Sequence, residues 1–279
     1  MQAIRVSIII ASYNASRTIE RCLRSISSQT LKPIEVILID GASTDETIEI
    51  FRSFKFSCSK VVSERDRGVY EAWNKGTSIA SGQWITFIGA DDEFSGEDSL
   101  EALWGETQSD RPFIYGCTDT YEPNGRFVGR HGGKFRNPFG LVHNFVRSQF
   151  PFPIMGTLYN RSFLGDARFD ESLQVTSDMD LVLGRLRKWD GLPPFFLRKV
   201  VVNMATGGIS TRSDYALLVM KEARLVRQRN GLSNVNLGLM TSYFVRYVFA
   251  KMDDMHLGGA VYGVRRLYRY LKQLTTLSR

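Results

Sequence analysis

Three short, mostly apolar runs in the first 90 residues constrain the fold most strongly. They span residues 6–10, 34–39 and 84–88 and are rich in isoleucine and other large apolar residues. Runs of this length predict strands that are buried on both faces, as in a parallel sheet covered by helices. Between the first two runs, one apolar face at helical spacing is formed by Ile19, Cys22, Leu23 and Ile26.

The same strand-to-helix pattern repeats along the chain. After residue 39, the stretch 43–46 (Ser-Thr-Asp-Glu) has the pattern of a capping box opening a helix that buries Ile48 and Phe51. Residues 60–63 predict a short strand, and 69–80 predict a helix that Ser81-Gly82 would end. Strands alternating with helices to about residue 116 predict a doubly wound α/β domain with a mostly parallel sheet and helices on both faces.

Beyond residue 116 the pattern becomes less regular. The glycine-rich stretch 118–153 predicts loops and short elements, 177–189 a helix and 200–204 a strand. Residues 214–279 predict mostly helices. We therefore divide the chain into 1–116 and 117–213, as two halves of one domain, and a helical extension at 214–279.

Composition bears on partners and location. Of the net charge of +7, residues 221–279 hold +8, and the basic, tyrosine-rich segment 240–279 suits an anionic membrane surface. Nucleic acid would also attract such a segment, but no nucleic-acid partner is expected. Three widely spaced cysteines and an N-terminus without signal-peptide features predict a cytoplasmic protein. The basic segment 240–279 further predicts peripheral contact with the inner face of the cell membrane.

Acidic side chains follow two of the predicted strands. Asp40 ends the second apolar run, and Asp91 and Asp92 come just after the run 84–88. Ligands bind at the carboxyl ends of parallel strands, so paired carboxylates there suggest a divalent cation held against a phosphate ester. An isolated Asp-Asp pair is more often a solvated turn, and Asp40 alone could be a turn aspartate.

Two further segments should reach the same edge of the sheet. Ser12 and Tyr13 follow the first strand and offer a hydroxyl and a ring to a nucleobase. Asp66, Arg67 and Asn74 lie between the Asp40 and Asp91 strands, where they could meet a ribose or diphosphate. A charge-rich helix start is more often a solvated surface.

Read together, these segments resemble glycosyltransferase family 2, inverting sugar-nucleotide transferases with a GT-A fold, of the bacterial surface-polysaccharide type. The similar motifs are 7–14 (Ser-Ile-Ile-Ile-Ala-Ser-Tyr-Asn), 40–45 (Asp-Gly-Ala-Ser-Thr-Asp), 66–76 and 90–92 (Ala-Asp-Asp). The resemblance implies a nucleotide-sugar site in residues 1–116 and Mg²⁺ or Mn²⁺ as cofactor.

The resemblance also implies roles for single residues. Asp40 should contact the base, Asp91 the ribose or metal, and Asp92 the metal. The other donor-binding residues should be Ala11, Ser12, Tyr13, Asp66, Arg67 and Asn74. Two departures stand out: Ala90 replaces the first acid of the DxD-type element, and 152–156 (Phe-Pro-Ile-Met-Gly) lacks a His-Gln pair common in related bacterial sequences.

Asp178 is the candidate general base. Family members often place this base just before a helix, as in the segment 176–181 (Thr-Ser-Asp-Met-Asp-Leu). If Ser177 is the N-cap, Asp180 falls at the third helical position and completes a capping box, whereas Asp178 has no such structural task. The alternative is that Asp178 only stabilises the helix dipole.

The predicted reaction is metal-assisted transfer of a sugar, most often from a UDP-sugar, to a hydroxyl of a saccharide or lipid-linked saccharide. Asp178 would take the hydroxyl proton. Two alternatives stay open: a non-catalytic protein that binds a nucleotide sugar or polyanion on a transferase scaffold, and a sugar nucleotidyltransferase. The second would need a glycine-rich basic phosphate loop, which 11–15 does not supply.

Overall fold

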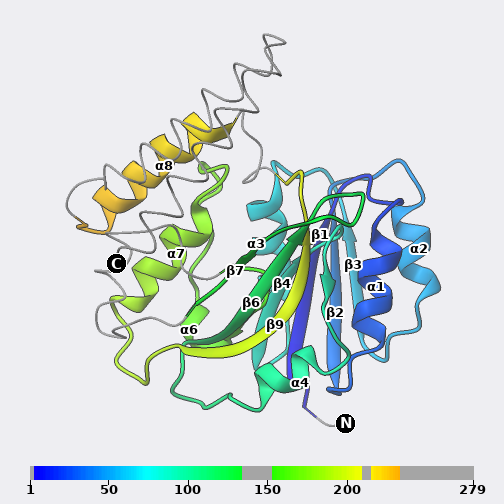
Figure 1. Ribbon diagram of the computed structural model, residues 1–279, viewed down its shortest axis with the longest axis horizontal. Coiled ribbons are helices and arrows are strands. Elements are labelled where there is room, and N and C mark those ends of the chain that lie inside the picture. The colour runs from blue at the N-terminus through cyan, green and yellow to red at the C-terminus, as the bar shows by residue number, and fades with distance from the viewer. Residues whose placement is uncertain (1–2, 134–152, 209–214, 233–279) are drawn as a thin grey trace.

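The computed structural model of the protein describes residues 3–133, 153–208 and 215–232. This part of the chain is organised by one sheet of nine strands with helices on both faces (Figure 1). The α/β class, with a mostly parallel sheet, is confirmed.

The first half alternates strands and helices, as the apolar runs predict. Its strands are β1 (Val6–Ser12), β2 (Ile34–Asp40), β3 (Ser59–Ser63), β4 (Trp84–Gly89) and β5 (Glu93–Phe94). Its helices are α1 (Ile19–Ser27), α2 (Thr47–Ser53), α3 (Val69–Ile79) and α4 (Ser99–Trp104). The second half contributes strands β6 (Phe113–Tyr121), β7 (Phe127–His131), β8 (Thr157–Asn160) and β9 (Phe195–Ala205), and helices α6 (Arg161–Leu164), α7 (Ser177–Leu186) and α8 (Ala216–Arg229).

The strand order is β3-β2-β1-β4-β8-β6-β9-β5, with β7 paired to β6. Strands β1 to β4 are mutually parallel, whereas β8 runs antiparallel to both β4 and β6. In the register, Ser12 lies opposite Asp40, Asp40 opposite Ser63, and Ala11 opposite Gly89. The carboxyl ends of the first four strands therefore meet at one edge, and the acids that follow them are brought together there.

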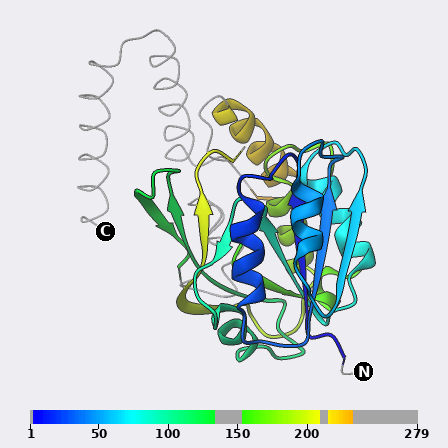
Figure 2. The same ribbon diagram turned by 90° about the vertical axis from the view of Figure 1, so that its right-hand side faces the viewer.

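Alternate residues of the central strands pack into two separate cores. In β1, Ile8 and Ile10 join the core beneath α1 and α4, whereas Ile9 joins the core beneath α3 and α7. Figure 2 shows α1 and α2 together on one face of the sheet. On the other face, Gly76 lets α3 approach β1 closely, since a Cβ there would lie 2.4 Å from Ile9 Cγ2.

The local expectations are confirmed in part. The short elements predicted within 118–153 include the end of β6, which runs to Tyr121 and forms a hairpin with β7. The predicted strand at 200–204 is confirmed and forms the C-terminal part of the longer β9. The residues at 43–46 form no capping box, because α2 begins at Thr47 and the Ser43 hydroxyl donates to Asp40 instead.

Two expectations concern boundaries and the C-terminal segment. β6 continues past residue 116, so the halves 1–116 and 117–213 share a strand. The segment 240–279 lies outside the described residues, as does residue 152 of the segment that departs from the family pattern. Among the described residues, no helix combines the length and apolar character needed to cross a bilayer.

Glu35 is a buried charge at the opposite end of the sheet from the strand-end acids. Its carboxylate is fully buried, lies 2.7 Å from Lys60 Nζ, and accepts hydrogen bonds from Ser7 Oγ (2.5 Å) and Ser81 N (2.8 Å). Burial alone would raise the pKa of Glu35, but the contacts with Lys60, Ser7 and Ser81 outweigh it and lower that pKa. This network ties β1, β2 and β3 to the end of α3.

We expect Glu35→Gln to lower the free energy of unfolding by about 2–3 kcal/mol, less than for a fully buried ion pair because Lys60 can reach water. Urea unfolding measures this, with the exposed Glu49→Gln as control. Because the pKa of Glu35 is lowered in the folded state, the wild-type advantage is present above pH 4.5 and is lost as the pH falls through the folded-state pKa. An equal loss in both variants would contradict this role.

Candidate active site

Asp40 is buried at the end of β2 and is surrounded by serines. Its carboxylate accepts hydrogen bonds from Ser12 Oγ (3.0 Å), Ser63 Oγ (2.8 Å), Ser43 N (2.8 Å) and Ser43 Oγ (2.5 Å). Burial alone would raise the pKa of Asp40, but these hydrogen bonds outweigh it and lower the pKa. Four donors fill the acceptor sites of one carboxylate. The structure therefore favours Asp40 as the organiser of three strand ends, and direct contact with a nucleobase would require a hydroxyl to turn away.

Tyr13 and Asp66 border the same strand end. A Cβ at Gly41 would lie 3.2 Å from Asp66 Oδ2 and 3.4 Å from Tyr13 Cδ2, so both side chains converge on this glycine. Tyr13 is 68% exposed, so its ring is accessible for stacking. The neighbouring Asn14 and Ala42 have positive φ angles of 46° and 64°, a sparsely populated conformation that persists where surrounding contacts impose it.

Asp91 and Asp92 converge at the end of β4. A Cβ at Gly89 would lie 2.6 Å from Asp91 Oδ1 and 2.9 Å from Asp92 Oδ2, so both oxygens approach one point above the strand. Asp92 is only 3% exposed, and its Oδ1 accepts a hydrogen bond from Ala205 N (3.0 Å). Burial and the neighbouring charge of Asp91 raise the pKa of Asp92 to about 7.

This pair fits a divalent cation. Arg21 lies nearby, but its guanidinium bonds to the backbone oxygen of Asp91 (2.6 Å) and pairs with Glu93 (3.3 Å). A cation would relieve the repulsion that raises the pKa of Asp92. Within the described ranges no group of three or more acidic, histidine or cysteine side chains suits a metal. One or two carboxylates beside substrate phosphates are, however, the usual protein share of a magnesium site.

Asp178 lies in the first turn of α7 and contacts α3. The Tyr70 hydroxyl donates to Asp178 Oδ1 (3.3 Å), and Met179 N–H donates to the same oxygen (2.9 Å). The Tyr70 ring stacks on Phe169, with centroids 5.7 Å apart, so the start of α3 is packed against the segment leading to α7. Burial raises the pKa of Asp178 to about 6.

The helical position of Asp178 differs from the prediction. Because α7 begins at Ser177, the N-cap is Thr176 and Asp178 is the second helical residue. Asp180 completes no capping box; its Oδ1 accepts a hydrogen bond from Asn230 Nδ2 (2.8 Å) at the end of α8. Asp180 thus has a structural role, but it is a contact between α7 and α8 and not a cap of its own helix.

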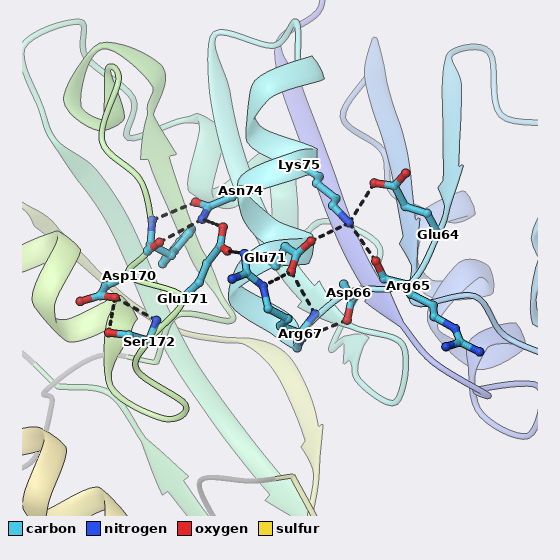
Figure 3. Close-up of polar contacts among 12 residues, drawn as sticks. Glu64, Arg65, Asp66, Arg67, Glu71, Asn74, Lys75, Asp170, Glu171 and Ser172 are labelled. Carbon is cyan, nitrogen blue, oxygen red and sulfur yellow. Dashed lines mark hydrogen bonds and ion pairs between the residues drawn. The ribbon is translucent and has the colours of Figure 1, made fainter.

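Arg67 and Asn74 join the two halves of the protein (Figure 3). The Asn74 amide donates to Phe169 O (2.9 Å), and its oxygen accepts from Phe169 N (2.8 Å). Arg67 pairs with Glu71 (2.8 Å) and with Glu171, and its side chain is 74% exposed. Asn74 is therefore committed to holding α3 against 169–171 and does not join the strand-end cluster, whereas Arg67 remains accessible beside Asp66.

Several residues of the site were not singled out from the sequence. Ser43, Ser63 and Tyr70 each contact a predicted site acid, and Glu222 of α8 binds the backbone that precedes Asp178. Ser63 ends a predicted strand beside the Asp40 strand, which was a usable signal. For Glu222 the sequence offered a weaker signal, because it is an acidic residue in an otherwise basic predicted helix.

The sequence profile described as Glycosyl transferase family 2 matches residues 7–166, more than half of the chain. The chain belongs to this family. Among its relatives, a PGL/p-HBAD biosynthesis glycosyltransferase of Mycobacterium bovis is 35% identical over 134 residues, which cover 46% of this chain and 52% of that protein. A cholesterol galactosyltransferase of Borreliella burgdorferi is 32% identical over 175 residues, covering 56% of this chain and 47% of that protein. The chain spans about half the length of these relatives.

Solved structures of glycosyltransferases share the fold of this family 2 member. S. aureus TarS 1–349 in complex with UDP-GlcNAc superimposes with a TM-score of 0.62 at 18% identity, covering 90% of this chain and 73% of TarS 1–349. The Pyrobaculum calidifontis mannosyltransferase PcManGT, in complex with GDP-Man and Mn²⁺, superimposes with a TM-score of 0.61 at 17% identity. The match covers 96% of this chain and 83% of PcManGT. The fold is thus the GT-A fold, as expected from the motifs.

Proposed function

We propose that this chain is an inverting glycosyltransferase that moves a sugar from a nucleoside-diphosphate sugar to a hydroxyl of a saccharide or lipid-linked saccharide. Family membership supports the reaction class. TarS binds UDP-GlcNAc, which supports a UDP-sugar donor, and the mannosyltransferase bound to GDP-Man keeps GDP-sugars as an alternative. The name of the cholesterol galactosyltransferase supports a lipid acceptor.

The observation that carries the proposal is the hydrogen bond between Tyr70 and Asp178. Tyr70 stands in the first turn of α3, four residues after Asp66, and Asp66 borders the strand end at Gly41. An acid from the second half of the chain therefore lies at the same end of the sheet as the donor-side acids. A base for the acceptor is needed at this location.

In the proposed reaction, Asp178 removes the proton from the acceptor hydroxyl as its oxygen attacks the anomeric carbon. The bond from that carbon to the diphosphate breaks on the opposite face, so the configuration inverts and a nucleoside diphosphate leaves. A base with a pKa of about 6 is ionised at neutral pH yet still accepts a proton readily. Tyr13 would stack on the base of the donor, and Asp66 and Arg67 would contact its ribose or diphosphate.

Asp92, with Asp91 beside it, would hold the divalent cation. Bound Mg²⁺ or Mn²⁺ would supply positive charge against the departing diphosphate. The Ala205 N–H keeps Asp92 Oδ1 in place and leaves Oδ2 directed to the point above Gly89 that Asp91 also approaches. Asp91 Oδ1 and Asp92 Oδ2 therefore both approach this point, where they would bind the cation.

Thermal unfolding with candidate donors tests the proposal. A ligand that binds only the folded state at a hundred times its Kd stabilises by about 2.7 kcal/mol, or roughly 5–10 °C in Tm for a chain of this size. We expect such a shift in Mn²⁺ with UDP-GlcNAc, UDP-galactose or GDP-mannose, and a much smaller one in EDTA. The anomeric configuration of the product, read by NMR, tests inversion. No shift with any of the three donors, together with no nucleoside-diphosphate release, would overturn the proposal.

A further inference from the structure

Glu222 is a buried acid in α8 that binds the backbone entering α7. It is 6% exposed, and its carboxylate accepts hydrogen bonds from three consecutive N–H groups: Gln174 (2.7 Å), Val175 (2.9 Å) and Thr176 (3.1 Å). The Thr176 hydroxyl donates to the same carboxylate (3.2 Å). Four hydrogen bonds from one short segment thus end on a single side chain from a distant helix.

These contacts fix the segment that enters α7 and serve the N–H of its N-cap. The first N–H groups of a helix and its approach have no intrahelical acceptor, and a side-chain oxygen at the N-cap commonly serves one of them. Here the N-cap Thr176 makes no such bond, because its hydroxyl is directed to Glu222. A carboxylate that accepts backbone N–H groups makes stronger hydrogen bonds than a neutral acceptor. Glu222 therefore anchors the segment entering α7, and it also accepts the N–H of the N-cap Thr176.

We propose that Glu222 is a positioning residue for Asp178. Asp178 follows Thr176 by two residues, so the segment held by Glu222 sets where the Asp178 carboxylate stands relative to Tyr70 and the strand ends. The inference rests on the proposed function, since it takes Asp178 as the base. It makes α8, which lies beyond the matched family segment 7–166, part of the acceptor-side machinery.

A second set of contacts fixes the far end of α8. Asn230 Nδ2 donates to Asp180 Oδ1 (2.8 Å), and Arg187 donates to the backbone oxygen of Asn230. Arg229 also pairs with Asp170 (2.7 Å), in the segment before α7. With its middle held through Glu222 and its C-terminal end through Asn230, α8 is anchored to α7 and its approach at two points, so Glu222 has little freedom to move.

Glu222 also acts on Asp178 through its charge. Titratable groups that face Asp178 are Tyr70 on α3, Tyr159 on β8 and Glu222 on α8. The negative charge of Glu222 adds to burial in raising the pKa of Asp178, whereas the Tyr70 hydrogen bond lowers it. Removal of the Glu222 charge should therefore move the acid limb of the pH profile to lower pH, without reducing the rate on the plateau. A lower rate on the plateau after substitution of Glu222 would instead indicate that Asp178 is displaced.

The test measures nucleoside-diphosphate release by the full chain in Mn²⁺, with UDP-GlcNAc, UDP-galactose or GDP-mannose, whichever wild type uses fastest. For Glu222→Gln we expect kcat on the plateau near pH 8 to fall about 10–100-fold, since small displacements of a catalytic group cost this much, with the donor KM within about 3-fold of wild type. Amide hydrogen exchange at 174–176 should accelerate. The neighbouring exposed Lys221→Gln is the matched control and should retain wild-type values.

The outcomes separate this inference from the proposed function. Faster exchange at 174–176 with an unchanged plateau kcat overturns the positioning role but leaves Asp178 as base. Absence of release by wild type overturns the proposed function itself. If Glu222→Gln does not fold, Thr176→Val decides, because it removes one of the four hydrogen bonds: a fall in kcat of about 2–10-fold at constant KM supports the inference, and a wild-type kcat overturns it.

Discussion

Asp178→Asn should lower the rate of sugar transfer by about 10²–10⁴-fold, the usual contribution of a positioned general base. The asparagine keeps an oxygen that can accept the Tyr70 hydrogen bond, so the fold should survive. Donor binding should also be retained, because in the proposed reaction Asp178 acts on the acceptor hydroxyl. Two quantities are measured: kcat at saturating donor, and the donor Kd from thermal shift.

The matched control is Asp180→Asn, two residues along the same helix. Its side-chain oxygen still accepts from Asn230, so near-wild-type transfer is expected. In wild type, the rate should rise as the pH rises through about 6, where Asp178 ionises, and this limb should be absent from the residual activity of Asp178→Asn. Full turnover by Asp178→Asn would falsify the base assignment.

Asp92→Asn should act in opposite directions on stability and on donor binding. In the metal-free protein the pKa of Asp92 is raised by burial and by Asp91, so ionisation costs the folded state stability as the pH rises from 3.8 to about 7. Asparagine removes this cost while its side-chain oxygen can still accept from Ala205 N, and we expect a gain of about 1–3 kcal/mol at pH 8.

The loss of donor binding should be larger than the gain in stability. Residues that only support metal ligands already change affinity or activity by about 10–100-fold when substituted, so a direct ligand should cost at least about 100-fold. The Mn²⁺-dependent shift in Tm with donor should disappear in Asp92→Asn. Asp98→Asn, at an exposed acid paired with Lys199, is the control. A full Mn²⁺-dependent shift in Asp92→Asn would remove this residue from the metal site.

The two aspartates come from halves of the sheet that meet through antiparallel β8. Strand β8 pairs with β4 on one side and with β6 on the other, and β6 then pairs with β9. Through this order, β9 supplies Ala205 N to Asp92, while α7 places Asp178 beside α3. The groups that we propose for the donor and for the acceptor thus lie at the same end of the sheet, although more than 80 residues separate Asp92 from Asp178 in sequence.

Local pattern was enough to predict the longer elements of the first half and the acids at their strand ends, but not short elements such as β5 and α6. The buried face of α1, formed by Ile19, Cys22, Leu23 and Ile26, is the one that helical spacing indicates. The apolar runs became β1, β2 and β4, because a strand covered on both faces requires apolar residues on both. Asp40 follows from the same logic, since the end of a parallel strand is set by where its apolar run stops.

The partners of these acids depend on contacts between segments that are remote in the chain. The Asp40 carboxylate accepts hydrogen bonds from serines at three strand ends. Asn74 binds the backbone of Phe169, and Glu222 binds the backbone of Thr176, 46 residues before it in the chain. Spacing within one element carries no information on such contacts, because a hydrogen bond across the sheet depends on strand order and helix packing. The acidic residues at the strand ends could be predicted along the chain, but what each carboxylate binds was decided by strand order and by the packing of helices on the sheet.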